Sequence, residues 1–143
     1  VAKGAIVRPR ATLIGPCAVL EGATVMDGAV IRGGTVIGPV TKAGSEIAGT
    51  IFQGHANKGH DGFLGNSVLG EWCNLGADTN NSNLKNNYKE VKLWNYTENS
   101  FTKTGRQFVG LFMGDHSKCG INTMFNTGCV IIIFTSHYPG NFS

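Results

Sequence analysis

The sequence predicts an all-β protein, a left-handed parallel β-helix of hexapeptide repeats with a projecting β-hairpin insert. Three observations lead to this prediction. A small and an aliphatic residue recur with a period of six, glycine accounts for 21 of the 143 residues, and only 15% of the residues are charged. Glycine costs about 1 kcal/mol relative to alanine inside a helix, and charged residues usually make up about 25% of a chain. This composition argues against helical bundles and coiled coils.

The repeat is regular over residues 5–43. Each block of six has a small residue first and an aliphatic residue third, and turn residues such as Gly and Asp close the block. The small positions are Ala5, Ala11, Cys17, Ala23, Ala29, Thr35 and Thr41, and the aliphatic positions are Val7, Leu13, Val19, Val25, Ile31 and Ile37, followed by Ala43. This period is the signature of a β-helix, in which three short strands form one coil of about eighteen residues and coils stack about 4.8 Å apart.

Two interruptions divide the rest of the repeat. The period slips by two residues near 44–47, and we expect it to resume with the small/aliphatic pairs Gly49/Ile51, His55/Asn57, Asp61/Phe63, Ser67/Leu69 and Cys73/Leu75. An excursion then covers about 80–110, before the pairs Leu111/Met113, Ser117/Cys119, Thr123/Phe125 and Cys129/Ile131. Within it, residues 89–94 and 101–104 flank a polar turn, which predicts the β-hairpin. We therefore treat residues 1–143 as one hexapeptide-repeat domain.

Charge and cysteine usage argue against several classes of function. Twelve basic and nine acidic residues are scattered, and the net charge of +3 is too mild to indicate a nucleic acid or membrane partner. The apolar run at 129–134 is far shorter than the roughly 20 residues of a membrane span. The four cysteines fall on inward repeat positions and form no CxxC zinc pattern. We expect them to be reduced packing residues in a cytoplasmic protein.

Polar residues interrupt the apolar repeat after position 54. In the expected register His55, Asn57 and Asp61 occupy inward positions, where an unsatisfied polar group is costly. Asparagine is absent before position 57, and six of the thirteen asparagines lie between 74 and 87. We therefore expect the chemistry to concentrate between about residues 55 and 92.

Three interpretations of the histidines remain open. His60 precedes an inward position, so its ring is expected to face a groove, where an unperturbed pKa near 6.5 suits a general base. Alternatively, His55, His60 and His116 are zinc ligands, since a catalytic zinc needs three protein ligands and a water. The third interpretation makes them satisfied turn residues, and we favour it for His55 and His116.

The segment 58–79 carries a resemblance to a known family. It reads KGHDGFLGNSVLGEWCNLGADT and resembles the acetyltransferase domain of bifunctional N-acetylglucosamine-1-phosphate uridylyltransferase/glucosamine-1-phosphate acetyltransferases. The motif of that family runs approximately G-H-L-x-Y-[IL]-G-D and then N-[IL]-G-A-G-T. The later segments 82–84 (SNL), 89–92 (KEVK), 113–117 (MGDHS) and 120–122 (GIN) are similar to a branch of sugar-1-phosphate nucleotidylyltransferase/acetyltransferases. The specific resemblance covers residues 58–128.

The resemblance implies roles for individual residues. His60 falls on the catalytic base of the family. Substrate-binding positions are Asn74, Asn83, Phe63 and the loop lysines Lys89 and Lys92, and the positions near the co-substrate acetyl-CoA are Gly76, Ala77, Gly114 and Asp115. No metal is implied. Phe63 stands where the family usually has tyrosine, and Asp78 stands where it has glycine, so we expect the substrate contacts to differ more than the reaction class.

The expected activity is direct acetyl transfer from acetyl-CoA to glucosamine 1-phosphate, which feeds UDP-N-acetylglucosamine biosynthesis. Three alternatives stay open: an acyltransferase acting on another amino-sugar phosphate, a zinc hydratase resembling γ-type carbonic anhydrase, and a non-catalytic hexapeptide scaffold. Because family members are trimers, we expect a homotrimer. A nucleotidylyltransferase domain is missing from the sequence, so we expect the chain to be the C-terminal part of a two-domain enzyme.

Overall fold

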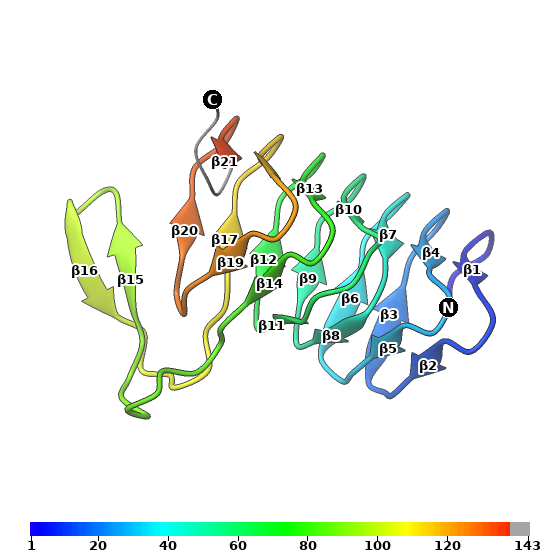
Figure 1. Cartoon of the computed structure of the whole chain (residues 1–143), viewed down its shortest axis with the longest axis horizontal. Helices are drawn as coiled ribbons and strands as arrows, with labels where there is room; N and C mark the ends of the chain where they lie inside the picture. Colours follow the sequence, from blue (N-terminus) through cyan, green and yellow to red (C-terminus); the bar gives the residue numbers. More distant parts are fainter. Residues whose placement is uncertain (138–143) are drawn as a thin grey trace.

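The computed structural model describes residues 1–137, which form the predicted left-handed parallel β-helix with an antiparallel hairpin beside it (Figure 1). Strands of two or three residues stack in parallel into a triangular prism. Face A contains β1 (Ile6–Val7), β4 (Thr24–Val25), β7 (Lys42–Ala43), β10 (Asn57–Lys58), β13 (Asn74–Leu75), β18 (Lys118–Cys119) and β21 (Ser136–His137). Each of these strands opens one coil of the helix.

The other two faces complete each coil. Face B contains β2 (Thr12–Leu13), β5 (Val30–Ile31), β8 (Glu46–Ala48) and β11 (Leu64–Gly65), and the pair β14 (Asn80–Asn81) and β19 (Met124–Phe125) continues it. Face C contains β3 (Cys17–Val19), β6 (Thr35–Ile37), β9 (Ile51–Phe52), β12 (Val68–Leu69), β17 (Phe112–Met113) and β20 (Val130–Ile131). We name the corners after the faces they join, as the A–B, B–C and C–A corners.

The core is a single column of inward side chains, and its register corrects one part of the prediction. Up to Ala43 the aliphatic positions point inward as expected. The next inward residue is Ile47, and after it come Phe52, Lys58 and Leu64, each one residue later than predicted and at most 1% exposed.

The prediction is therefore wrong for five residues that were expected to point inward: Ile51, His55, Asn57, Asp61 and Phe63. Ile51 is 44% exposed, and His55 and Asp61 are exposed. Instead of one two-residue slip, the chain has three shortened turns. Only four residues separate the inward positions 43 and 47, and five separate 47 from 52 and 64 from 69, where a regular repeat has six. The predicted register holds again from Leu69 onward.

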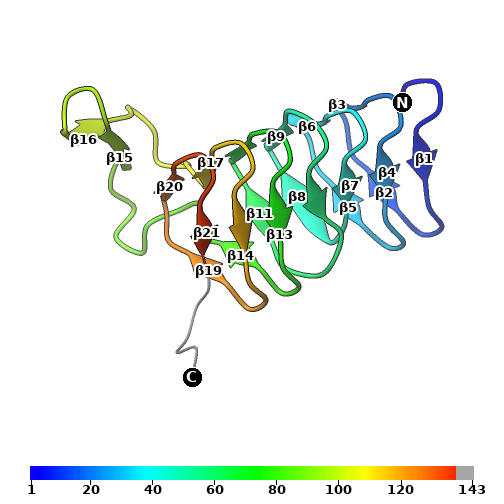
Figure 2. The same cartoon turned by 90° about the horizontal axis from the view of Figure 1, so that it is seen from above.

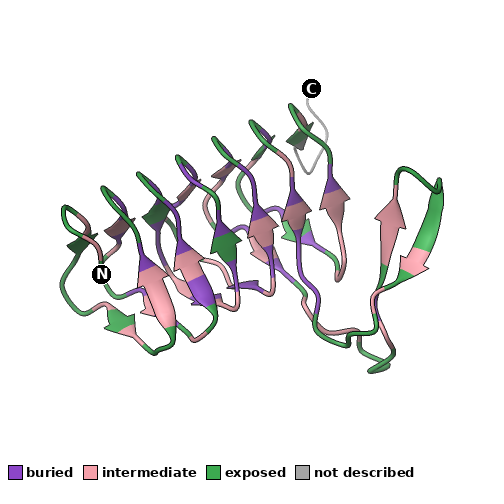
Figure 3. Cartoon of the chain, turned by 180° about the vertical axis from the view of Figure 1, so that it is seen from behind, coloured by how far each residue is buried: buried purple, intermediate pink, exposed green. Residues whose placement is uncertain are grey.

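The long excursion leaves the helix one strand later than predicted, because β14 still belongs to a coil. It spans residues 82–110 and contains the predicted hairpin, formed by β15 (Lys92–Asn95) and β16 (Ser100–Lys103). Figure 2 shows the hairpin standing apart from the coils. In Figure 3 the buried residues follow the inside of the coils, whereas the hairpin is half-buried or exposed. The hairpin is thus an appendage of the β-helix and not one of its coils.

The four cysteines are free and take the packing positions predicted for them. Cys73 and Cys119 are buried, and Cys17 and Cys129 are half-buried. Burial raises the pKa of the Cys73 thiol to about 11 and also raises that of Cys129. Both thiols are therefore protonated at neutral pH, which suits packing better than nucleophilic chemistry. Residues 1–137 contain no helix with the length and apolar character to cross a membrane.

Candidate active site

His60 lies at the A–B corner between β10 and β11, and its side chain is exposed. The same corner contains Gly62, whose φ of +114° is accessible mainly to glycine. A Cβ at this position would collide with the carbonyl oxygen of Thr79. The missing side chain therefore lets the His60 corner rest directly on the A–B corner of the next coil.

That neighbouring corner carries Gly76 and Ala77. The Gly76 N–H donates to the Cys119 carbonyl at 3.1 Å, and the Asn122 N–H donates to the Ala77 carbonyl at 2.8 Å. Gly76 also needs its missing Cβ, which would lie 2.5 Å from the Gly120 carbonyl carbon. The structure thus places these two predicted residues at the same corner as His60, and it commits the Gly76 amide hydrogen to the backbone ladder.

A polar row runs along the outside of face A and passes beside the His60 corner, which follows β10. Its members lie opposite one another in successive strands: Lys42, Asn57, Asn74 and Lys118. The Asn57 Nδ2 group donates to Asn74 Oδ1 at 3.0 Å. Asn74 is one of the residues predicted from the sequence, whereas Asn57 was predicted to lie in the core. The two asparagines are 17 residues apart, which is one coil containing a shortened turn, and this spacing is the signal that could have paired them.

Phe63 and Asn83 are brought together over Gly65, close to the B–C corner. A Cβ on Gly65 would collide with the Phe63 ring and would lie 2.8 Å from Asn83 Nδ2. The Asn83 Nδ2 group donates to Asn66 Oδ1 at 2.7 Å, and these two asparagines are again 17 residues apart. The buried Asn81 side chain fixes Gly65 by accepting from its N–H at 2.8 Å and donating to its carbonyl at 3.0 Å. Asn66 and Asn81 were missed by the sequence analysis.

The predicted lysines Lys89 and Lys92 belong to the excursion and are exposed. Lys89 follows a turn in which its N–H donates to Asn87 Oδ1 at 3.1 Å. Lys92 opens β15 directly opposite Lys103 of β16, so the two cations share one cross-strand position. Like charges directly opposite one another destabilise a hairpin. Lys103 is thus a further candidate that the sequence analysis did not name.

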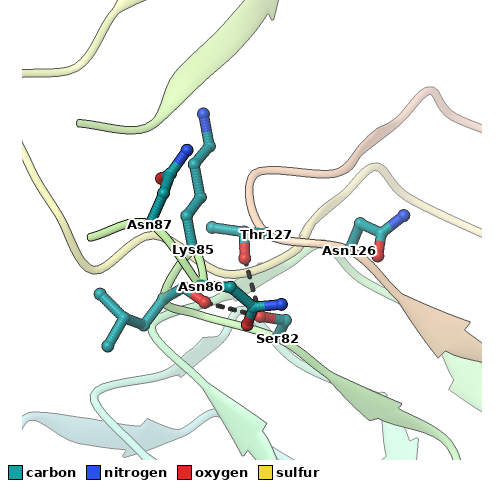
Figure 4. A pocket seen from close by; sticks show the side chains of 7 residues that line it. Ser82, Lys85, Asn86, Asn87, Asn126 and Thr127 are labelled. Atoms are coloured by element: carbon teal, nitrogen blue, oxygen red, sulfur yellow. Dashed lines mark hydrogen bonds between the residues drawn. The ribbon is translucent and has the colours of Figure 1, made fainter. Parts of the chain in front are cut away.

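A cavity of about 360 Å³ lies at the foot of the excursion (Figure 4). Ser82 Oγ donates to the Leu84 carbonyl at 3.0 Å and lies 2.7 Å from Thr127 Oγ1, which joins the excursion to the last B–C corner. Lys85 also lines this cavity, whereas Lys89 and Lys92 do not. All of its lining residues except Leu84 carry a polar group, and none of them is a residue proposed from the sequence.

Gly114 and Asp115 lie at the C–A corner, on the opposite side of face A from His60. Asp115 Oδ1 accepts the Glu71 N–H at 2.8 Å, and a side chain on Gly70 would collide with this carboxylate. Both predicted residues line a cavity of about 250 Å³ on the outside of face C, together with Phe112 and Ile133. Within one chain the structure therefore does not bring Gly114 and Asp115 together with His60.

The remaining histidine candidates form part of an aromatic stack at this C–A corner. The rings of His55, Trp72, His116 and Phe134 lie within 5° of parallel, and neighbouring centroids are 4.3, 6.3 and 4.9 Å apart. Trp72 separates His55 from His116, and His60 sits at a different corner, so the three predicted zinc ligands do not converge within the chain. Among residues 1–137, no three His, Cys, Asp or Glu side chains gather closely enough to hold a metal ion.

No protein-family model matches the chain. Its sequence is nevertheless similar to those of several named proteins. The bifunctional sugar-1-phosphate nucleotidylyltransferase/acetyltransferase of Sulfurisphaera tokodaii is 32% identical over 98 residues, which cover 68% of this chain and 24% of that protein. The bifunctional protein GlmU of Methanococcus aeolicus is 36% identical over 87 residues, or 61% of this chain and 20% of the relative.

The bifunctional protein GlmU of Methanocaldococcus jannaschii gives a similar result, with 33% identity over 84 residues, or 59% of this chain and 20% of the relative. The matched part thus spans about a fifth to a quarter of the length of these relatives. The predicted family resemblance is confirmed: a large part of this chain is similar to a part of the bifunctional sugar-1-phosphate nucleotidylyltransferase/acetyltransferases.

Proposed function

We propose that this chain transfers an acetyl group from acetyl-CoA to the amino group of glucosamine 1-phosphate. The observation that carries the proposal is the exposed imidazole of His60, at a corner that adjoins the amide row of face A. The names of the relatives support the reaction class, since each of the matched proteins is bifunctional and one name includes acetyltransferase explicitly. The names do not specify the acceptor, and the choice of glucosamine 1-phosphate is our proposal.

In the proposed reaction, neutral His60 acts as a general base. Its imidazole accepts a proton from the substrate amine while the amine nitrogen attacks the carbonyl carbon of the thioester. The carbon–sulfur bond then breaks, and the imidazolium returns the proton to the departing thiolate of CoA. No covalent enzyme intermediate is required. The raised thiol pKa values of Cys73 and Cys129 are consistent with direct transfer.

The surrounding residues supply binding and charge stabilisation. The side-chain amides of Asn74 and Asn83 hydrogen-bond sugar hydroxyls, and the Phe63 ring covers an apolar part of the sugar. Because the Gly76 N–H is used in the ladder, the N–H of Ala77 is the better donor for the oxyanion of the tetrahedral intermediate. Lys89 and Lys92 pair with the phosphate.

The arm of CoA runs past Gly114 and Asp115 of the C–A corner. Since one chain keeps this corner apart from His60, we propose that copies of the chain complete the site in a homotrimer. In the full-length protein we propose that a nucleotidylyltransferase domain precedes the β-helix and uses the product.

The test is thiol release from acetyl-CoA in the presence of a panel of amino-sugar phosphates. We expect glucosamine 1-phosphate to be the best acceptor and His60→Ala to lower kcat by about 10²- to 10⁴-fold, the usual contribution of a general base. His116→Ala is the matched control, because His116 is also exposed but belongs to the stack at the C–A corner. Equal rates for His60→Ala and wild type would remove His60 from the mechanism, and no turnover with any acceptor would overturn the proposed function.

A further inference from the structure

Lys58 is an anomaly of the core. Its side chain occupies the inward position of β10, and it is 0% exposed. Among the residues whose burial the structure describes, Lys58 is the only buried Lys, Arg, Asp or Glu. The inward neighbour in the preceding coil is Ala43, paired with Lys58 across β7 and β10. This small side chain leaves room inside the prism for a long one.

The amine of Lys58 reaches back to the loop that carries His60. Lys58 Nζ donates to the carbonyl oxygen of His60 at 2.5 Å and to that of Asp61 at 2.8 Å. Two consecutive carbonyls of the A–B corner are thus held from inside the core, while the His60 ring stays exposed outside. Fixing both carbonyls restricts the backbone that sets the direction of the ring.

A buried ammonium is not needed for the stability of this core. The equivalent inward positions on both sides along the chain are Phe52 and Leu64, which fill the prism without any charge. An apolar side chain of similar volume commonly replaces a buried charge with no loss of stability, and often with a gain. The two hydrogen bonds to the loop are therefore the feature of Lys58 that an apolar residue cannot supply.

We propose that Lys58 is a positioning residue, which holds the His60–Asp61 backbone from within the core and so orients the His60 imidazole for proton transfer. The inference rests on the proposed function of His60. Small displacements of a reacting group lower the rate steeply, so losing the two hydrogen bonds should reduce kcat more than it changes substrate binding.

The charge state of Lys58 provides a second observable. Burial lowers its pKa from 10.5 to about 8, while the carboxylates of Asp61 and Asp78 and the nearby Cys119 act in the opposite direction. The folded state therefore binds fewer protons than the unfolded state between about pH 8 and 10.5. Through this group, stability rises with pH across that window. The cost of the buried charge is fully present below pH 8.

Lys58→Met is the decisive variant, because methionine fills the inward position without an amine. We expect kcat to fall about 10- to 100-fold, with the KM for acetyl-CoA unchanged within about twofold. We also expect a melting temperature equal to or above that of wild type at pH 7, with the difference shrinking between pH 8 and 10.5. Leu64→Met is the matched control: it changes the next inward position and leaves the loop hydrogen bonds intact.

Backbone NMR relaxation separates this inference from the proposed function. The order parameters of the backbone amides of residues 59–62 should be lower in Lys58→Met than in wild type or Leu64→Met. If wild type shows no turnover, the proposed function fails, and this relaxation measurement alone decides whether Lys58 holds the loop. Unchanged order parameters in Lys58→Met, or wild-type kcat in an otherwise active protein, would overturn the inference.

Discussion

At the scale of single residues, the candidate site depends on side chains that are absent as much as on those that are present. Gly62, Gly65 and Gly76 each lie where a Cβ would strike a neighbouring group. These contacts let the corners and strands of successive coils approach closely enough to place His60 beside Ala77, and Phe63 beside Asn83. The chemistry of the site therefore requires glycine at positions that bear no functional group.

Gly62→Ala tests this dependence on glycine. The new Cβ meets the Thr79 carbonyl and must also adopt a φ of +114°, so we expect a loss of about 2–4 kcal/mol in the free energy of unfolding, measured by urea denaturation. Gly28→Ala is the matched control. Gly28 also lies at an A–B corner with positive φ, but nothing lies within 4 Å of its added Cβ. We expect it to cost about 1 kcal/mol, and equal losses in both variants would contradict the argument.

At the scale of elements, the sequence predicts the register of a coil correctly wherever only one residue in each block can be the inward aliphatic one. It does so up to Ala43 and from Leu69 onward. Between these points Ile51 and Phe52 are both apolar, and so are Phe63 and Leu64, so neither pair identifies the inward residue by itself. The shortened turns then decide the register, and a fixed period cannot reveal them.

As with the coils, some residues of the candidate site could be identified from the sequence and others could not. His60, Asn74 and Asn83 stand out as polar residues within a recognisable motif. Lys58 could not be found in the same way, because lysine is ordinarily exposed and only the true register turns its side chain inward. The asparagine partners Asn57 and Asn66 become visible once a coil of 17 residues is allowed.

The hairpin makes a prediction at the same scale, because β15 and β16 set Lys92 opposite Lys103. A phosphate between these cations would relieve their repulsion. We expect Lys103→Glu to stabilise the hairpin through an ion pair, and to raise the KM for glucosamine 1-phosphate about 5- to 10-fold. The KM for unphosphorylated glucosamine should stay unchanged. Lys3→Glu, a change of equal charge in the first coil, is the control, and parallel changes in KM for both acceptors would remove the lysine pair from phosphate binding.

At the scale of the whole molecule, the three faces of the prism differ in what they present outward. Face A carries the polar row of Lys42, Asn57, Asn74 and Lys118, which passes beside the His60 corner. On face C the outward residues lie opposite one another from strand to strand and are all apolar: Ala18, Val36, Ile51, Val68, Phe112 and Val130. We propose that this continuous apolar row is a surface for association with another protein surface. Since Gly114 and Asp115 border the same face, a second copy packed there would meet the residues proposed for acetyl-CoA.

Association through face C gives the last prediction. Val68 lies at the centre of the apolar row, so Val68→Asp buries an unpaired carboxylate at any interface formed there. We expect wild type to scatter light as a particle of about three times the chain mass of 15.2 kDa, and Val68→Asp to be monomeric and to lose turnover together with assembly. Thr24→Asp places the same charge on the outside of face A and should leave both properties intact. A wild-type monomer that is fully active would show that one chain completes the site, and an active dimer would contradict threefold assembly while keeping face C as the surface of contact.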